Sequence, residues 1–164
     1  MTRHRSIALS AGVLMLISAS AFATREEHAF EVLVEIPAPS FYVIPSEPDW
    51  IHRDQILPWN PGTKTLGGLR KNFDVKHDTS ALGARLESEA YLSNGNDEQN
   101  IPLQISFNGR VLSHELPPRR VVSAAEAVIG GRFALEIQPV QPVGGFQPGS
   151  YYATVQLIFS AEAP

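Results

Sequence analysis

The chain has 164 residues, of which 43% are hydrophobic and 18% charged, and its formal net charge at pH 7 is −4. A mildly acidic chain without a basic tract is not expected to bind nucleic acid, because phosphate neutralisation requires clustered Lys and Arg. It contains no cysteine, which excludes disulfides, thiolate metal ligands and a cysteine nucleophile.

The first residues have the pattern of a secretory signal peptide. A basic start precedes the apolar run Ile7–Ile17, and Ala21 and Ala23 form a small-x-small cleavage motif. The apolar run is shorter than the roughly 20 residues that span a bilayer, so an uncleaved anchor is the less favoured alternative. Cleavage after Ala23 would remove two of the 13 Lys and Arg residues and none of the 17 Asp and Glu residues. The remaining 141 residues would have a formal net charge of −6. We therefore expect residues 1–23 to be a signal peptide, followed by one exported domain.

A strand pattern follows the cleavage motif closely. Apolar residues alternate with Glu31, Leu33 and Glu35, which indicates a strand with one buried face formed by Phe30, Val32, Val34 and Ile36. Leu33 is the one apolar residue on the other face. An exposed apolar strand is an aggregation hazard unless something covers it. A free arm of this kind is expected to be donated to a neighbouring chain, which predicts a polymer subunit rather than an enzyme.

Short strands separated by turn signals fill the rest of the chain. Alternating or apolar runs predict strands at Phe41–Ile44, Leu69–His77, Leu82–Leu92, Ile101–Phe107, Phe133–Ile137 and Tyr151–Phe159. Asn94-Gly95 and Asn108-Gly109 are the strongest turns, and a return strand begins at Val111. Val121–Ile129 is ambiguous, because part of it also fits a helical turn. Roughly seven short strands without a sustained helical pattern predict an antiparallel β-sandwich, immunoglobulin-like in the broad sense.

No pattern in the chain favours catalysis or metal binding. His77-Asp78 resembles a hydrolase dyad but fits a turn better, and no nucleophile elbow is present. The five histidines lack the spacing of metal ligands, and the paired glycines precede no phosphate-binding helix. Asn94–Glu98 offers calcium-compatible oxygens without the remaining ligands of a calcium loop. We expect no enzyme activity, no metal and no cofactor.

The two tryptophans leave two interpretations open. Trp50 and Trp59 both lie in the segment Trp50–Asn60, where they would suit a carbohydrate-stacking platform. Ordinary packing in the core or at a subunit interface is the favoured interpretation. The basic pair Arg119-Arg120 is expected to be a solvated turn.

Three segments carry motifs of a known family. Leu57–Thr65 contains Asn-Pro-x-x-Lys-Thr, Ile101–Ser113 contains a Gly-x-Val-Leu-Ser hairpin, and Gly149–Phe159 contains Gly-x-Tyr-x-Ala-x-Val. Together with the arm, these segments resemble the major subunits of class 5 fimbriae. That alternate chaperone–usher group includes the colonisation factor antigen and coli surface antigen pilins.

The resemblance implies an all-β fold, an incomplete immunoglobulin-like antiparallel β-sandwich completed by donor-strand exchange. Each subunit would lack one strand and leave a hydrophobic groove, which a periplasmic chaperone fills before the arm of the next subunit replaces it at an outer-membrane usher. Residues 24–37 would form the donor-strand extension and residues 38–164 the pilin domain. The donor side chains would be the four apolar arm residues. The candidate groove wall is the terminal strand, with Tyr151, Ala153, Val155, Leu157 and Phe159.

The expected function is that of a major shaft subunit, exported through the periplasm to a fimbria on the cell surface. Its implied partners are identical subunits arranged head-to-tail, the chaperone, the usher and a tip adhesin. A tip adhesin would need an additional binding domain, so a shaft subunit is the favoured interpretation. A minor or adaptor pilin of the same system is an open alternative. Two alternatives come from different classes: a secreted monomeric β-sandwich binding module, for carbohydrate for example, and a periplasmic chaperone-like or inhibitor domain.

Overall fold

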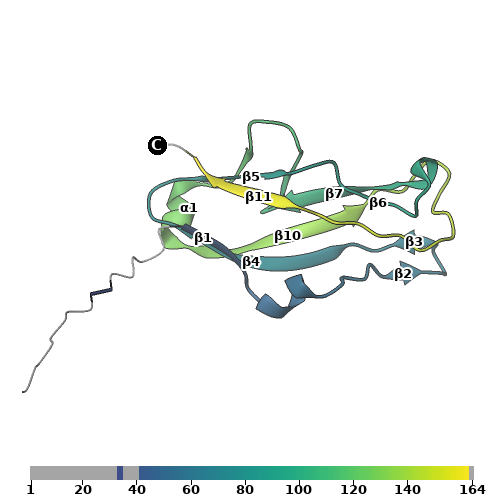
Figure 1. Ribbon diagram of the computed structural model, residues 1–164, viewed down its shortest axis with the longest axis horizontal. Helices are drawn as coiled ribbons and strands as arrows, with labels where there is room; N and C mark the ends of the chain where they lie inside the picture. Colours follow the sequence, from purple (N-terminus) through teal and green to yellow (C-terminus); the bar gives the residue numbers. More distant parts are fainter. Residues whose placement is uncertain (1–32, 35–40, 163–164) are drawn as a thin grey trace, which may run out of the picture. The chain divides into compact units, whose positions relative to one another are not determined.

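The computed structural model describes residues 33–34 and 41–162. The chain divides into two units, residues 1–36 and 37–164, and the second holds every strand and helix of the described part. Its strands are β1 (Phe41–Pro45), β2 (Trp59–Asn60), β3 (Thr65–Leu66), β4 (Leu69–His77), β5 (Leu82–Leu86), β6 (Tyr91–Leu92), β7 (Ile101–Phe107), β8 (Arg110–Val111), β9 (Arg119–Val122), β10 (Gly131–Pro139) and β11 (Leu157–Ala161). Its helices are the 3₁₀ turns η1 (Pro48–His52) and η2 (Asp97–Gln99) and the short α1 (Ala124–Ile129) (Figure 1).

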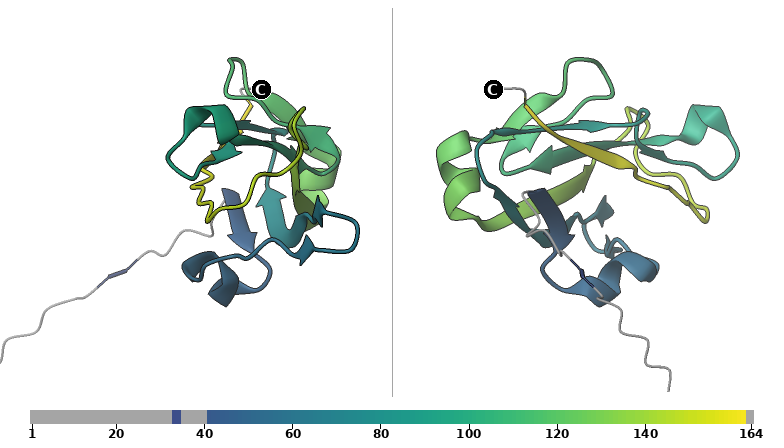
Figure 2. Two further views of the ribbon diagram at one scale, coloured as in Figure 1. Left: turned by 90° about the vertical axis from the view of Figure 1, so that its right-hand side faces the viewer. Right: turned by 60° about the vertical axis from the view of Figure 1, so that its left-hand side comes forward.

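Two antiparallel sheets form the sandwich. The larger has the strand order β1-β4-β10-β7-β6, with β8 also paired to β7, and the smaller has the order β11-β5-β9. Figure 2 shows the two layers from other directions. The strands β2 and β3 form a separate hairpin. The all-β antiparallel fold predicted from the alternating apolar residues is confirmed.

The core lies between the sheets and follows the period-2 pattern of the strands. In β7 the four odd-numbered residues Ile101, Leu103, Ile105 and Phe107 are buried, whereas Pro102 and Gln104 between them are exposed. From the smaller sheet, β5 buries Leu82, Ala84 and Leu86 against them. Each strand therefore turns one apolar face inward, as its sequence alternation requires.

Aromatic rings join the two sheets at the centre of this core. Phe159 of β11 lies 5.0 Å from Phe107 of β7 and 6.2 Å from Phe73 of β4, measured between ring centroids. Phe73 and Phe107 are themselves 5.9 Å apart, and Trp50 of η1 meets Phe73 edge-on at 5.8 Å. Tilted and edge-to-face pairs of this kind add to the stabilisation from apolar burial.

Two local signals in the sequence produce the expected turns. Asn108 (φ 49°) and Gly109 (φ 70°) both adopt positive φ, as a two-residue hairpin between β7 and β8 requires. The ambiguous segment before β10 is helical because Ser123 and Glu126 form a capping box at the start of α1. The hydrogen bonds from Ser123 hold the pKa of Glu126 below its usual value.

Two expected strands are shorter than the sequence pattern indicates. Leu82–Leu92 is divided, because β5 belongs to the smaller sheet while β6 crosses to pair with β7 of the larger. The expected terminal strand Tyr151–Phe159 therefore has β5 as its ladder partner over only part of its length. Tyr152 forms only an isolated bridge with Ser93, and regular pairing with β5 begins at Leu157.

Within the described residues, no helix is both long and apolar enough to cross a membrane. The same part of the chain contains no group of three or more His, Asp or Glu side chains placed to hold a metal ion.

Replacing Phe107 with alanine tests the importance of the aromatic core. Its side chain is 0% exposed, so we expect Phe107→Ala to lower the free energy of unfolding by about 3–5 kcal/mol. Phe41→Ala is the matched control, because it deletes the same ring from a position that is 38% exposed, and it should cost much less. Urea unfolding followed by tryptophan fluorescence measures both. Equal losses would show that the ring cluster is not the centre of the fold.

Candidate functional site

The sandwich has one flank at which both sheets end in an edge strand. In residues 41–162, β1 pairs only with β4, and β11 pairs only with β5. Phe159 of β11 contacts Phe73 of β4, the strand next to β1, while β9 at the other end of the smaller sheet contacts β8. The edges of β1 and β11 therefore border the same flank, which we call the open flank (Figures 1 and 2).

The edge of β11 presents hydrogen-bonding groups of the backbone. The Glu87 N–H donates to the Gln156 carbonyl and the Glu162 N–H donates to the Ala81 carbonyl, so even-numbered residues of this segment bond toward β5. Alternation in an antiparallel ladder then directs the N–H and C=O groups of Leu157, Phe159 and Ala161 toward the open flank. This is an unbroken row of donors and acceptors.

The edge of β1 is less complete. The Ser46 N–H donates to the Asn72 carbonyl, and the same alternation turns the backbone groups of Phe41, Val43 and Pro45 toward the open flank. Proline has no N–H, so β1 offers one donor fewer at its carboxyl end. Of the two edges, β11 is the better template for an added strand.

Apolar side chains at the open flank are only partly covered. Val43 of β1, Trp50 of η1, and Leu157 and Phe159 of β11 pack against the buried core and stay half-buried. Unpaired strand edges beside partly covered apolar side chains are what a further strand would complete, with backbone hydrogen bonds giving affinity and side chains giving register.

The five candidate residues of the groove wall differ in their surroundings. Val155, Leu157 and Phe159 are half-buried against the core. Tyr151 is half-buried and donates its hydroxyl to the Gln147 carbonyl at 3.1 Å, whereas Ala153 is exposed outside the regular strand. Sequence reasoning missed Val43 and Trp50, because no single-strand pattern tells which strand lies at the edge of a sheet.

Only part of the predicted donor strand is described. Val34 is 75% exposed and Leu33, expected on the opposite face, is 93% exposed. Phe30, Val32 and Ile36 lie outside the described residues, as do Ala21 and Ala23 of the predicted cleavage motif.

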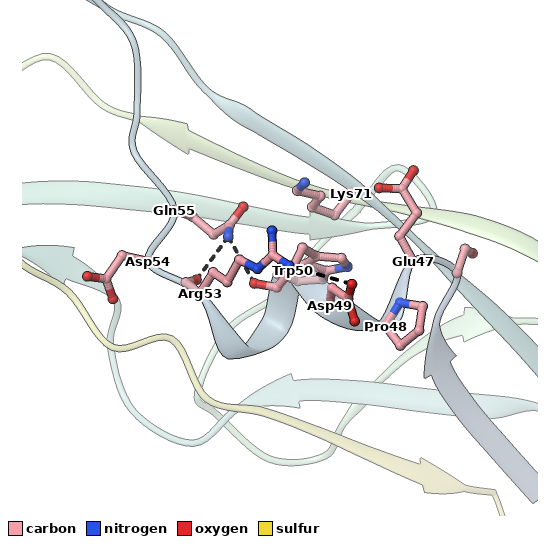
Figure 3. A pocket seen from close by; sticks show the side chains of 9 residues that line it. Glu47, Pro48, Asp49, Trp50, Arg53, Asp54, Gln55 and Lys71 are labelled. Carbon is pink, nitrogen blue, oxygen red and sulfur yellow. Dashed lines mark hydrogen bonds and ion pairs between the residues drawn. The ribbon is translucent and has the colours of Figure 1, made fainter.

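A surface pocket of about 620 Å³ lies beside η1 (Figure 3). Some of its polar groups bond to one another: Arg53 extends to Asp49 at 3.5 Å, and the Gln55 side chain donates to the Trp50 carbonyl at 2.9 Å. The Lys71 ammonium lies 5.5 Å from the centroid of the Trp50 ring, a cation–π distance. Trp50 itself is half-buried and packs edge-on against Phe73, which agrees with the favoured interpretation of core packing.

A charged cluster on the outer face fixes β1 to the rest of the larger sheet. The Arg132 Nε of β10 donates to Asp74 Oδ1 at 2.9 Å, and the Ser46 hydroxyl that follows β1 donates to the same oxygen at 2.8 Å. These hydrogen bonds, that of Arg132 first, hold the pKa of the Asp74 carboxyl below its ordinary value of 3.8. One carboxylate on the outer face thus connects β4 with β10 and with the residue that follows β1.

Comparison with known proteins identifies the family. The model of the CS1 type fimbrial major subunit family matches residues 26–160 of this chain. The chain belongs to the CS1 type fimbrial major subunit family. The family match confirms the resemblance to class 5 major subunits and makes the protein a pilin, a subunit that associates with other pilin subunits in a surface fimbria.

A solved structure agrees with this assignment at the level of the fold. The CooA pilin subunit from enterotoxigenic Escherichia coli matches with a TM-score of 0.60 and 18% sequence identity, over 75% of this chain and 88% of that chain. At this identity the similarity shows a shared fold. The search of curated proteins gave no match to this CS1 type subunit.

Acid sensitivity tests the role of Asp74 in this pilin. Because its pKa is lowered on folding, the carboxylate should stabilise the fold above pH 4, and this contribution should disappear as the pH falls through the folded-state pKa. We therefore expect Asp74→Asn to lower the urea midpoint at pH 7 and to match the parent chain at the most acidic pH at which both fold. Asp78→Asn, in the exposed turn after β4, is the control. A difference that is constant with pH would contradict this role.

Proposed function

We propose that this pilin is the major shaft subunit of a chaperone–usher fimbria and polymerises by donor-strand complementation. The segment Phe30–Ile36 of one subunit adds a strand to the open flank of its neighbour, between β1 and β11. The observation that carries the proposal is the open flank itself, where two sheet edges with unsatisfied backbone groups border half-buried apolar side chains.

The composition of the arm suits this role. Phe30, Val32, Val34 and Ile36 alternate along one face, and burying four such side chains contributes about 6–12 kcal/mol before ordering costs. Glu31 and Glu35 alternate with them and stay solvated on the other face. Hydrogen bonds from the arm to Leu157, Phe159 and Ala161 add to the apolar term.

The proposed contact determines the kind of assembly. An arm that enters a different surface of its neighbour forms a heterologous contact, which generates an open filament rather than a closed ring. Before assembly the exposed strand edges are an aggregation hazard, so a periplasmic chaperone is needed to cover them. At the usher, the arm of the next subunit then replaces the chaperone. The proposed function is mechanical, without catalysis: the shaft carries a tip adhesin to its target.

Removing and relocating the arm tests this mechanism. The chain beginning at Thr24 should form heat-resistant ladders, and deletion of residues 24–37 should leave an unstable chain that does not polymerise. Returning that segment at the carboxyl terminus behind a short flexible linker should give a stable monomer, because each subunit then completes its own flank. Light scattering after size-exclusion chromatography, with urea unfolding, measures the outcome. If the deleted chain is a well-folded monomer with the stability of the intact chain, the proposal fails and a monomeric binding module is favoured.

Two neighbouring arm residues test the register of the donor strand. Val34→Asp should abolish the ladders, because it removes an apolar group worth about 1.5–3 kcal/mol and places a carboxylate in an apolar groove. Leu33→Asp is the matched control, since a one-residue step places its side chain on the opposite face. Gel electrophoresis of unheated samples compares the two variants. The reverse pattern would show a register shifted by one residue, and full polymerisation of both would rule out insertion of this segment.

A further inference from the structure

Two exposed apolar patches are not used by the open flank. The loop patch consists of Trp59 in β2 with Val140, Val143 and Phe146 in the segment after β10. The helix patch consists of Val128 and Ile129 at the end of α1. Val143 is fully exposed and Ile129 is 83% exposed, and a large apolar side chain in such a position indicates an interaction surface when it is not isolated.

The two patches lie at opposite ends of the sandwich. Helix α1 ends at Ile129, two residues before β10 begins at Gly131, and the loop patch follows Pro139, where β10 ends. Trp59 belongs to the same end as the loop, because its ring meets Phe146 edge-on at 5.8 Å. Figure 1 shows α1 at one end of β10 and the β2–β3 hairpin at the other. We call these the helix end and the loop end.

The composition of the loop patch is that of a buried contact rather than of a solvated surface, and the helix patch adds exposed apolar side chains. The segment 138–150 contains no charged residue, although 18% of the chain is charged. On α1, Ala125, Val128 and Ile129 are apolar and exposed, together with the charged Glu126 of the first turn, and only Ala127 is buried below them. Depletion of charge around apolar and aromatic side chains is typical of the core of a protein–protein interface.

The direction of the donor strand follows from the open flank. Phe41 pairs with His77 and Ala161 pairs with Leu82, so the start of β1 and the end of β11 both adjoin the tight turn between β4 and β5. The strands β1 and β11 therefore run in opposite directions, and an inserted strand is parallel to one of them. Antiparallel pairing with β11 is favoured, because such ladders are slightly more stable and because Pro45 interrupts the donors of β1. The donor strand then finishes beside Leu157, toward the loop end.

The short link between arm and domain limits where the donating subunit lies. Five Cα steps separate Ile36 from Phe41, which allows a reach of roughly 18 Å at most. Phe41 lies at the helix end of its own subunit. It pairs with His77, which is the last residue of β4 and lies at the end of that strand opposite to the β2–β3 hairpin. Helix α1 also contacts β4. The helix end of the donating subunit is therefore brought to the loop end of the accepting subunit.

We infer that the helix patch of each subunit docks on the loop patch of the subunit that accepts its arm. The occupant of the loop patch is a second copy of this chain, and the contact repeats along the filament. This inference rests on the proposed donor-strand mechanism. It adds a second, apolar contact that limits rotation of one subunit against the next about the short link.

Engineered cysteines test the contact cleanly, because the chain contains none of its own. The double variant Ile129→Cys, Val143→Cys places one thiol in each patch. The nine residues of β10 separate these positions by about 30 Å within one subunit, so a short bis-maleimide reagent can join them only between subunits. Assembled filaments are treated with the reagent, boiled in detergent with concentrated urea until the untreated cysteine-free parent runs as a monomer, and separated by electrophoresis.

The expected result is a covalent ladder from the double variant. The control pair, Val111→Cys with Val143→Cys, keeps the loop thiol but moves the other to the side strand β8, and it should stay monomeric. If the filaments form but the two variants give the same pattern, the end-to-end contact is wrong and donor-strand exchange is unaffected. If the cysteine-free parent forms no heat-resistant ladder before treatment, the donor-strand mechanism fails and this inference fails with it.

Discussion

The contact of Phe159 with Phe73 and Phe107 is the interaction on which the rest of the structure depends. It is the point at which the edge strand of the smaller sheet is held against the larger sheet. Because no disulfide is available, apolar packing and the ladder with β5 fix β11 in place. The same packing leaves the other edge of β11 without a partner in the described residues. The strand that closes the core is therefore also a strand with one unpaired edge in residues 41–162.

The incomplete flank explains features that a self-contained domain would not need. A monomeric sandwich normally protects its edges with charges, bulges or covering loops. Here the two edges that border one flank carry half-buried apolar side chains, and the protective charge lies elsewhere, on the outer face around Asp74. That arrangement holds β1 in position without blocking the groove. In the proposed mechanism, this exposure is the basis of assembly, since each subunit would complete the core of another.

The direction of β11 relates the flank to the ends of the molecule. A strand inserted antiparallel to β11 finishes near the loop end, and a link of five Cα steps keeps the donating domain close to that end. Groove, link and end patches are then parts of one geometry, rather than separate surfaces. The inferred contact between successive subunits would give a common explanation for the uncharged loop after β10 and for the exposed apolar side chains of α1.

The sequence by itself determined several strands of this protein and its family, although Arg119-Arg120, expected to be a solvated turn, lies in β9 and pairs with β5. Alternation in Ile101–Phe107 gave the buried face of β7, Asn108-Gly109 gave the hairpin, and three motifs gave the resemblance that the family match confirmed. Only the tertiary structure decided that Leu82–Leu92 divides between the sheets, which shortens the terminal strand. It also decided which strands are edges, and so added Val43 and Trp50 to the open flank. The reason is physical: side-chain periodicity is local to a strand, whereas sheet order depends on contacts between residues far apart in the chain.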